Sequence, residues 1–224
     1  ISFTVPRGSV VGIIGGTGSG KSSLVSLIPH FYDVKDGRVS VFGKNICAYD
    51  DEDLRHRIGY VQQKAVLFQG TVRSNLLWGD DSASDDDLRT ALSTAQVLDI
   101  VADKGGLDAP VEQNGANFSG GQKQRLSVAR ALVRKPQILV LDDSSSALDY
   151  ATEAAMRKAI LALPYKPTLF VVSQRASSVM CADRILVLED GRLVGDGTHK
   201  ALLANCPVYC EIYHSQFSEE VTDA

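Results

Sequence analysis

A glycine-rich segment carries the clearest chemistry in this 224-residue sequence. It runs Gly15-Gly16-Thr17-Gly18-Ser19-Gly20-Lys21-Ser22, with Ser23 after it, and it fits the pattern G-x-x-x-x-G-K-S/T. Glycines let successive backbone N–H groups turn inward toward an anion, and a following helix adds its positive N-terminal end. Lys21 would reach β- and γ-phosphate oxygens, and the Ser22 hydroxyl would ligate Mg²⁺. The segment therefore predicts a binding site for a nucleoside triphosphate.

An apolar run that ends in two carboxylates is the second feature. Residues 138–141 read Ile-Leu-Val-Leu, which is typical of a buried strand, and Asp142 and Asp143 follow. A carboxylate at the end of such a strand is the usual second protein contact of the magnesium ion in a phosphate-loop site. We therefore predict that Asp142 and Ser22 hold one Mg²⁺.

The elements that would position these residues alternate between strand and helix. The expected strands are 1–5, 10–14, a short one from Gly37, 137–141, 168–173, 184–188 and, after an Asp190-Gly191 hairpin turn, 192–194. Helices are expected from Ser22, from Leu88 after a capping box of Ser84 and Asp87, over 97–102, from about Gln122, and over 151–161. This order predicts an α/β core formed by 1–75 and 136–224, with a helical insertion at 76–135.

Composition excludes several classes of protein. Hydrophobic residues make up 44% of the chain, and the formal charge is −4, so we expect neither a disordered chain nor a nucleic-acid partner. No apolar run approaches the roughly 18 residues that cross a bilayer. Cys47, Cys181, Cys206 and Cys210 form no C-x-x-C pair and are expected to be reduced thiols. The four histidines are scattered along the chain, so the sequence does not predict a zinc site.

The segment Phe118-Ser119-Gly120-Gly121-Gln122-Lys123-Gln124-Arg125 resembles the signature motif of ATP-binding-cassette (ABC) ATPases, in which Leu usually precedes Ser-Gly-Gly-Gln. The resemblance covers nearly the whole chain. Residues 60–63 are similar to the Q-loop, 146–149 to the D-loop, and 67–73 and 197–203 to exporters of this family. The resemblance implies a P-loop NTPase core of ABC ATPase type, with an inserted helical subdomain and a flanking antiparallel β portion.

The resemblance also implies cofactors and partners. ATP and Mg²⁺ would bind between two domains paired head to tail, each ATP lying between one phosphate loop and the other domain's signature. Here the signature is Ser119, Gly120, Gly121 and Gln122. Gln63 would sense Mg²⁺ and the membrane domain, and Asp149 would contact the paired domain. Transmembrane domains would precede this segment in the full-length protein and place it at the cytoplasmic face of the cell membrane.

Three positions depart from the family pattern. Asp143 stands where the family has a Glu that serves as general base, and Gln174 stands where it has the switch histidine. Asp143 is one methylene shorter, and the neutral Gln174 amide carries neither a proton nor a positive charge. Gln113 replaces a Glu expected before the signature. Asp143 and Gln174 therefore predict a catalytic site that binds ATP and turns it over slowly.

An intact signature beside a degenerate site predicts one half of a heterodimeric exporter, whose second nucleotide-binding domain is not identical. A regulatory ATP-binding module without hydrolysis of its own is the alternative. A DNA-repair or translation ATPase of the same superfamily would need coiled coils, paired cassettes or a basic face, and a small-molecule kinase would leave the signature unexplained. The aromatic residue on which the family stacks adenine is expected to be missing from this segment.

Overall fold

The computed structural model describes residues 1–144 and 147–217. Ser146, the first residue of the predicted D-loop, lies outside the described residues. The chain divides into two compact units, one formed by Ile1–Asp51 and Thr168–Ala224 and the other by Glu52–Pro167. The insertion predicted at 76–135 falls within the second unit, and its boundaries stay a prediction.

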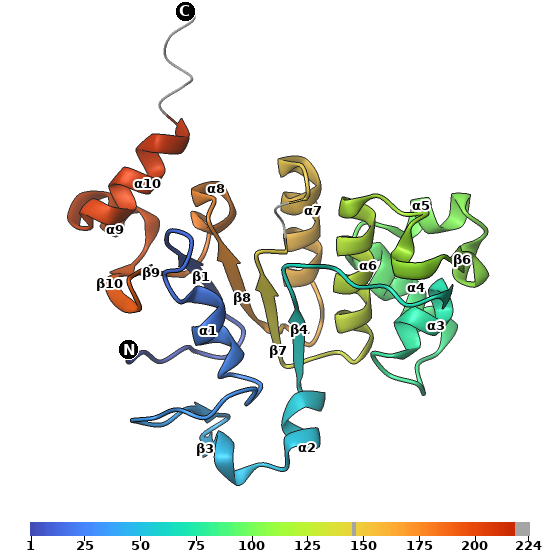
Figure 1. Ribbon diagram of the computed structural model, residues 1–224, viewed down its shortest axis with the longest axis horizontal. Helices are drawn as coiled ribbons and strands as arrows, with labels where there is room; N and C mark the ends of the chain where they lie inside the picture. Colours follow the sequence, from blue (N-terminus) through green and yellow to red (C-terminus); the bar gives the residue numbers. More distant parts are fainter. Residues whose placement is uncertain (145–146, 218–224) are drawn as a thin grey trace, which may run out of the picture. The chain divides into compact units, whose positions relative to one another are not determined.

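Four neighbouring strands of a β-sheet, in the order β10-β9-β1-β8, organise the first unit (Figure 1). Strand β1 (Val10–Ile14) lies between β8 (Thr168–Ser173) and β9 (Arg184–Glu189) and is parallel to both. Strand β10 (Arg192–Gly197) pairs antiparallel with β9. All residues of β1 and β8 are buried, as expected where a parallel sheet is covered on both faces. The predicted hairpin turn is confirmed, with φ of 45° at Asp190 and 74° at Gly191, as a type I′ turn requires.

The remaining elements of the first unit surround this sheet. Helices α1 (Lys21–Ser26) and α8 (Ala176–Val179) pack on it, and α9 (His199–Asn205) and α10 (Pro207–Phe217) follow β10. Strands β2 (Ser40–Val41) and β3 (Lys44–Asn45) form a small antiparallel pair that leads into the 3₁₀ helix η1 (Ile46–Ala48).

Two strand predictions at the start of the chain are wrong. Residues 1–5 form no strand, and the Thr4 carbonyl accepts a hydrogen bond from the Arg184 side chain instead of pairing with a neighbouring strand. The strand expected from Gly37 is reduced to the two residues of β2. Gly37 itself has a φ of 88°, which is incompatible with an extended strand.

The second unit combines a parallel strand pair with helices. Strand β4 (Ile58–Val61) pairs with β7 (Ile138–Asp142). Helix α6 (Gly120–Val133) packs against β4, α3 (Val72–Leu77) and α4 (Asp85–Thr94), and α4 also contacts α5 (Leu98–Asp103) and α7 (Tyr150–Leu161). The shorter elements are α2 (Asp51–His56) at the boundary of the units, the paired strands β5 (Gly70–Thr71) and β6 (Pro110–Val111), and the 3₁₀ helices η2 (Gly106–Asp108) and η3 (Gln113–Gly115).

Side-chain caps fix where two of these helices begin. The predicted capping box of α4 is confirmed, because Ser84 Oγ accepts from the Asp87 N–H at 3.2 Å and Asp87 Oδ2 accepts from the Ser84 N–H at 3.2 Å. Ser119 and Gln122 form the same reciprocal pair at the start of α6. Helix α5 is separate from α4 because Gln96, between them, has a φ of 57°.

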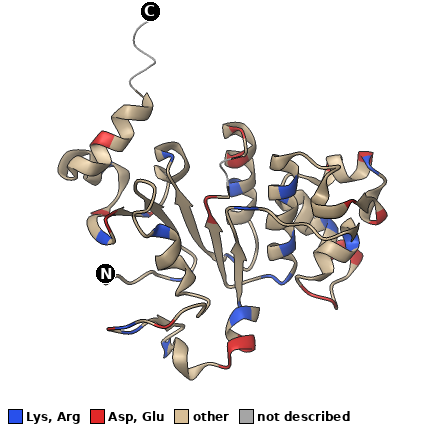
Figure 2. Cartoon of the chain, viewed as in Figure 1, with Lys and Arg blue, Asp and Glu red and all other residues tan. Residues whose placement is uncertain are grey.

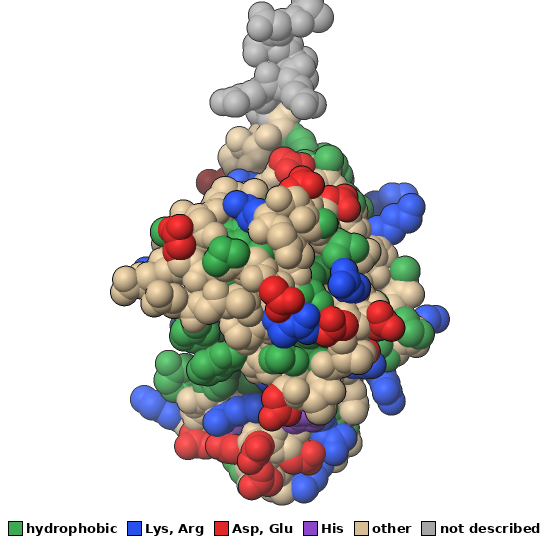
Figure 3. Space-filling model, turned by 90° about the vertical axis from the view of Figure 1, so that its right-hand side faces the viewer, with side chains coloured by type: hydrophobic (Ala, Val, Ile, Leu, Met, Phe, Trp, Pro, Cys, Tyr) green, Lys and Arg blue, Asp and Glu red, His purple; other side chains and the backbone are tan. Residues whose placement is uncertain are grey.

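Acidic and basic residues are interspersed on both units (Figure 2). On the face shown in Figure 3, side chains of both signs lie beside one another, with hydrophobic side chains between them. Arg73 pairs with Asp85 and Asp108 in the second unit, and Arg184 Nε lies 2.6 Å from Asp196 Oδ1 in the first. Among the described residues, no helix combines the length and apolarity that crossing a bilayer requires.

Candidate functional site

The predicted phosphate loop connects β1 to α1 in the first unit. Gly15 is required by a close approach, because a Cβ on it would lie 2.1 Å from the backbone oxygen of Leu188. Gly20 is required by its backbone, since its φ of 93° lies in the left-handed region that favours glycine. Gly16, Thr17 and Gly18 between them are exposed. The loop is therefore a tight turn whose middle residues are open to a ligand.

Lys21 is a buried cation held by the loop itself. Its Nζ lies 2.9 Å from the Gly15 oxygen, 2.7 Å from the Gly16 oxygen and 3.4 Å from Ser19 Oγ. The side chain is nearly solvent-inaccessible, whereas Ser22 and Ser23 on the next turn are exposed. An ammonium group surrounded by the loop's own oxygen atoms provides a fixed positive charge next to exposed backbone N–H groups, and this arrangement suits phosphate oxygens.

The predicted switch residue lies beside this loop. Gln174 directly follows β8, and its Oε1 accepts a hydrogen bond from the Thr17 hydroxyl at 3.3 Å. Its backbone carbonyl accepts from Gln216 Nε2 at 2.8 Å, and Gln216 Oε1 accepts from the Ala176 N–H at 2.8 Å. Helix α10 thus fixes the segment that carries Gln174. Sequence reasoning missed Gln216, because a single glutamine far along the chain carries no spacing signal.

The two predicted carboxylates lie at the end of β7 in the second unit. Asp142 is buried, and its Oδ2 accepts a hydrogen bond from the Tyr60 hydroxyl at 2.8 Å. Asp143 Oδ2 accepts from Gln63 Nε2 at 2.8 Å. These pairs meet because β4 and β7 are parallel neighbours, so that their carboxyl ends lie at the same edge. Tyr60 lies in the segment that resembles the Q-loop, but its role as a partner of Asp142 was missed.

The backbone at Asp143 is unusual. Its φ of 47° is in the left-handed region, which residues other than glycine seldom adopt. Such conformations occur often at functional positions, where the surrounding structure holds them. Here the hydrogen bond from Gln63 is one of the interactions that keep the carboxylate in place.

The signature residues lie at the start of α6, also in the second unit. Ser119 is the N-cap of this helix, and its Oγ accepts from the Gln122 N–H at 3.3 Å. Ser119 and Gly120 are exposed. Gly121 faces Ala147, since a Cβ on Gly121 would lie 2.9 Å from the Ala147 oxygen. The exposed backbone at the start of this 14-residue helix is a second group of N–H donors suited to an anion.

Asp149 caps helix α7. Its Oδ1 accepts from the Thr152 N–H at 2.9 Å and its Oδ2 from the Thr152 hydroxyl at 2.7 Å. These hydrogen bonds, the backbone one first, lower the pKa of Asp149. Gln113 lies in η3, and its side chain is exposed.

The donor set predicted for magnesium is chemically suitable. Asp142 offers a carboxylate, Ser22 a hydroxyl, and Gln63 its amide oxygen, since its amide nitrogen already donates to Asp143. Hard oxygen ligands of this kind are the ones Mg²⁺ prefers. When bound, the ion supplies neutralisation of phosphate charge.

A glycine-rich loop that joins a buried parallel strand to a helix, with its lysine buried in the loop, defines the first unit as a phosphate-loop nucleotide-binding fold. A family model described as "ABC transporter" matches residues 1–146. The chain therefore belongs to the ABC transporter family.

Known relatives and a solved structure agree with this assignment. An uncharacterized ABC transporter ATP-binding protein of Bacillus subtilis, YfiB, is 44% identical over 225 residues, covering 100% of this chain and 39% of that protein. The ATP-dependent lipid A-core flippase of Haemophilus ducreyi is 40% identical over 221 residues, covering 98% of this chain and 38% of that protein. The structure of a bacterial Atm1-family ABC exporter with ATP bound has a TM-score of 0.92 and 37% identity, covering 97% of this chain and 38% of that one.

The similarity to the Atm1-family structure confirms the predicted α/β fold of ABC ATPase type. The chain spans under two fifths of the length of these relatives, 39% of the Bacillus protein and 38% of the flippase.

Proposed function

We propose that this chain is the nucleotide-binding domain of an exporter. In this role it binds Mg-ATP, pairs with a second nucleotide-binding domain, and couples closure of that pair to transport by attached transmembrane domains. It would act at the cytoplasmic face of the membrane. The lipid A-core flippase and the Atm1-family exporter support the proposal by similarity. The observation that carries it is the buried Lys21 ammonium held in the phosphate loop.

When ATP binds, the loop residues would exchange their present hydrogen-bond partners for phosphate oxygens. Lys21 would give up the Gly15 and Gly16 carbonyls for β- and γ-phosphate oxygens, while loop N–H groups donate to the same phosphates. Gln174, which already bonds Thr17 at the loop, would donate from its amide nitrogen to a phosphate oxygen. Asp142, hydrogen-bonded by Tyr60, would share the magnesium ion with Ser22.

We propose further that turnover at this phosphate loop is slow. A general base must reach the attacking water, and the shorter Asp143 carboxylate is engaged by Gln63 instead. Loss of a well-placed general base typically costs about 10²- to 10⁴-fold in rate. Gln174 adds to the deficit, because a neutral amide does not take over the charge or proton of a histidine.

The signature would serve a second domain. Ser119 and Gly120 are exposed at the start of α6, and the Gly120 N–H would donate to an ATP carried by a partner. The Ser119 N–H, which donates to Gln122 Oε1 at 3.0 Å, would exchange that acceptor for the phosphate. A partner with an intact Glu and His would then form the active site, and the pair would be a heterodimer. The inserted helical lobe at 76–135 would carry this signature.

A regulatory module that binds ATP without hydrolysing it is the second candidate function. The hydrogen bond between Gln63 and Asp143 favours it, because that bond occupies the carboxylate that would otherwise activate water. The two candidates differ in whether ATP is turned over when the partner domain is present.

Nucleotide binding by the chain tests the proposal first. We expect the purified chain to bind Mg-ATP and the substitution Lys21→Ala to weaken binding at least tenfold. Lys200→Ala, which removes an exposed lysine from α9, should leave binding unchanged. Equal ATP binding by the chain and by Lys21→Ala would refute the assignment of the loop.

Pairing then separates the candidates. The chain is mixed with a partner domain that carries Glu and His, and ATP hydrolysis is followed. As an exporter half, the chain should support turnover that Ser119→Arg abolishes and Lys21→Ala largely preserves. Absence of turnover in the mixture, with ATP still bound, would favour the regulatory module.

A further inference from the structure

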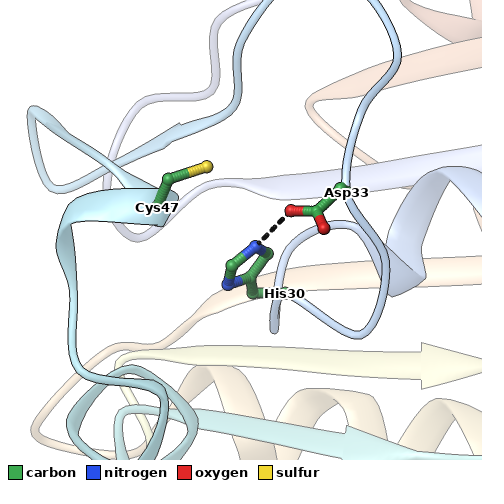
Figure 4. A group of neighbouring side chains, drawn as sticks. All are labelled: His30, Asp33 and Cys47. Atoms are coloured by element: carbon green, nitrogen blue, oxygen red, sulfur yellow. Dashed lines mark hydrogen bonds and ion pairs between the residues drawn. The ribbon is translucent and has the colours of Figure 1, made fainter.

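Three side chains with metal-binding atoms meet on the first unit, away from the phosphate loop. They are His30 and Asp33, on the segment after α1, and Cys47 in η1. A ring nitrogen, a carboxylate oxygen and the sulfur all lie within 4.8 Å of one another. In Figure 4 the cysteine sulfur extends toward the space beside the imidazole and the Asp33 carboxylate. The linear sequence did not reveal this grouping, because Cys47 belongs to a different turn.

The imidazole of His30 is held in a fixed orientation. Its Nδ1 lies 3.0 Å from Asp51 Oδ1, and its Nε2 lies 2.9 Å from Asp33 Oδ1. The side chain of His30 is only 18% exposed, whereas that of Asp33 is 85% exposed. Metal-binding histidines characteristically donate their second ring N–H to a carboxylate, which fixes the ring and its tautomer. Asp51 supplies that carboxylate, and Nε2 is the nitrogen that faces the other two groups.

We infer that His30, Asp33 and Cys47 form a zinc-binding site, with Asp51 as the carboxylate that orients the histidine. Nitrogen, oxygen and sulfur ligands together suit Zn²⁺, and a thiolate selects against Mg²⁺ and Ca²⁺. Three protein ligands leave a fourth tetrahedral position for water.

The closing of this site needs only small side-chain movements. Zinc bonds of about 2.0–2.3 Å place tetrahedral ligand atoms roughly 3.5 Å apart. The exposed side chains of Asp33 and Cys47 are able to rotate by this amount, and zinc would replace the hydrogen bond between Nε2 and Asp33. The backbone under Cys47 is already fixed, because Asn45 Oδ1 accepts from the Cys47 N–H at 3.1 Å.

Zinc bound here would cross-link two segments of the first unit. The segment that follows α1 carries two ligands, and η1 carries the third. Because a ligand that binds only the folded state stabilises it by mass action, zinc should raise the melting temperature of the chain. This inference does not depend on ATP binding or hydrolysis.

Titration of the reduced, metal-free chain with Zn²⁺ tests the inference by calorimetry, without nucleotide. We expect one ion per chain, and at least a tenfold loss of affinity in Cys47→Ser and in His30→Gln. Asp51→Asn should weaken zinc about 10- to 100-fold, as removal of an orienting partner does. Cys181→Ser removes another exposed thiol and should bind zinc as the unaltered chain does.

Cobalt gives an independent readout of the sulfur ligand. The Co²⁺-loaded chain should show a thiolate-to-cobalt charge-transfer band that disappears in Cys47→Ser and persists in Cys181→Ser. Circular dichroism of each metal-free variant checks that the fold is retained. If His30→Gln does not fold, Cys47→Ser, at an exposed position, still tests the zinc site. No zinc binding by the chain, or equal affinity in folded Cys47→Ser, would overturn the inference.

Discussion

The Tyr60 hydroxyl donates a hydrogen bond to Asp142 Oδ2 across 2.8 Å, from one strand to its parallel neighbour. Asp142 is a buried carboxylate. A hydroxyl that donates to one of its oxygens fixes the orientation of the group. In the proposed magnesium site, Tyr60 would hold the Asp142 carboxylate in position for the ion.

Removal of this hydroxyl should weaken magnesium binding. In Tyr60→Phe we expect the Mg²⁺ concentration needed for half-maximal ATP binding to rise about 10-fold, within the range found for orienting partners of metal ligands. Binding of ATP in the presence of EDTA should change little. Tyr49→Phe is the matched control, because that hydroxyl donates to the Val41 carbonyl away from the site. An unchanged magnesium requirement in Tyr60→Phe would show that the tyrosine hydroxyl does not support magnesium binding.

Gly15 tests the packing under the phosphate loop. A Cβ at this position would lie 2.1 Å from the Leu188 oxygen, so Gly15→Ala must displace backbone. We expect a loss of about 1–3 kcal/mol in the free energy of unfolding, measured by urea denaturation. In Gly16→Ala the added Cβ meets no atom within 4 Å, and the loss should stay within about 0.5 kcal/mol. Equal losses in both variants would contradict the close approach.

Asp87 gives the second unit a measurable dependence on pH. The hydrogen bond from Lys135, with smaller contributions from hydrogen bonds with Ser84, lowers the pKa of Asp87 to about 2. Because this pKa is below the unfolded value of about 4, the stabilisation is complete above about pH 4 and is lost as the pH falls toward 2. The stability gap between the chain and Asp87→Asn, from urea denaturation, should therefore shrink over that range. Asp86→Asn controls for the change in net charge, and a gap that does not vary with pH would contradict the assignment.

Local patterns predicted the elements that carry the candidate site residues better than the hydrogen bonds between those residues and distant parts of the chain. The phosphate loop, the strand that ends at Asp142, and the capping box of Ser84 and Asp87 depend on residues close together in sequence. The structure places each in the predicted element. The hydrogen bonds from Tyr60 to Asp142 and from Gln216 to the Gln174 carbonyl join residues that are far apart in the sequence, so no local spacing indicates them.

The wrong strand prediction at residues 1–5 and the side-chain grouping that the sequence did not reveal have the same physical origin. Residues 1–5 have an alternating pattern suited to a strand, but they pair with no strand, and the Thr4 carbonyl accepts from the distant Arg184 side chain instead. The fold of the segment between His30 and Cys47 brings these two side chains together, which no local pattern in the sequence indicates. Pairing partners of this kind are set by tertiary structure rather than by local propensity.

The rate of ATP hydrolysis by the isolated chain, compared with that of the double variant Asp143→Glu/Gln174→His, tests the central claim most directly. The substitutions restore a longer carboxylate and a titratable side chain beside the loop. We expect the double variant to hydrolyse ATP at least about 10²-fold faster, with ATP affinity changed only slightly, and Lys21→Ala to abolish the gain. Turnover by the unaltered chain that already equals that of the double variant would contradict the account.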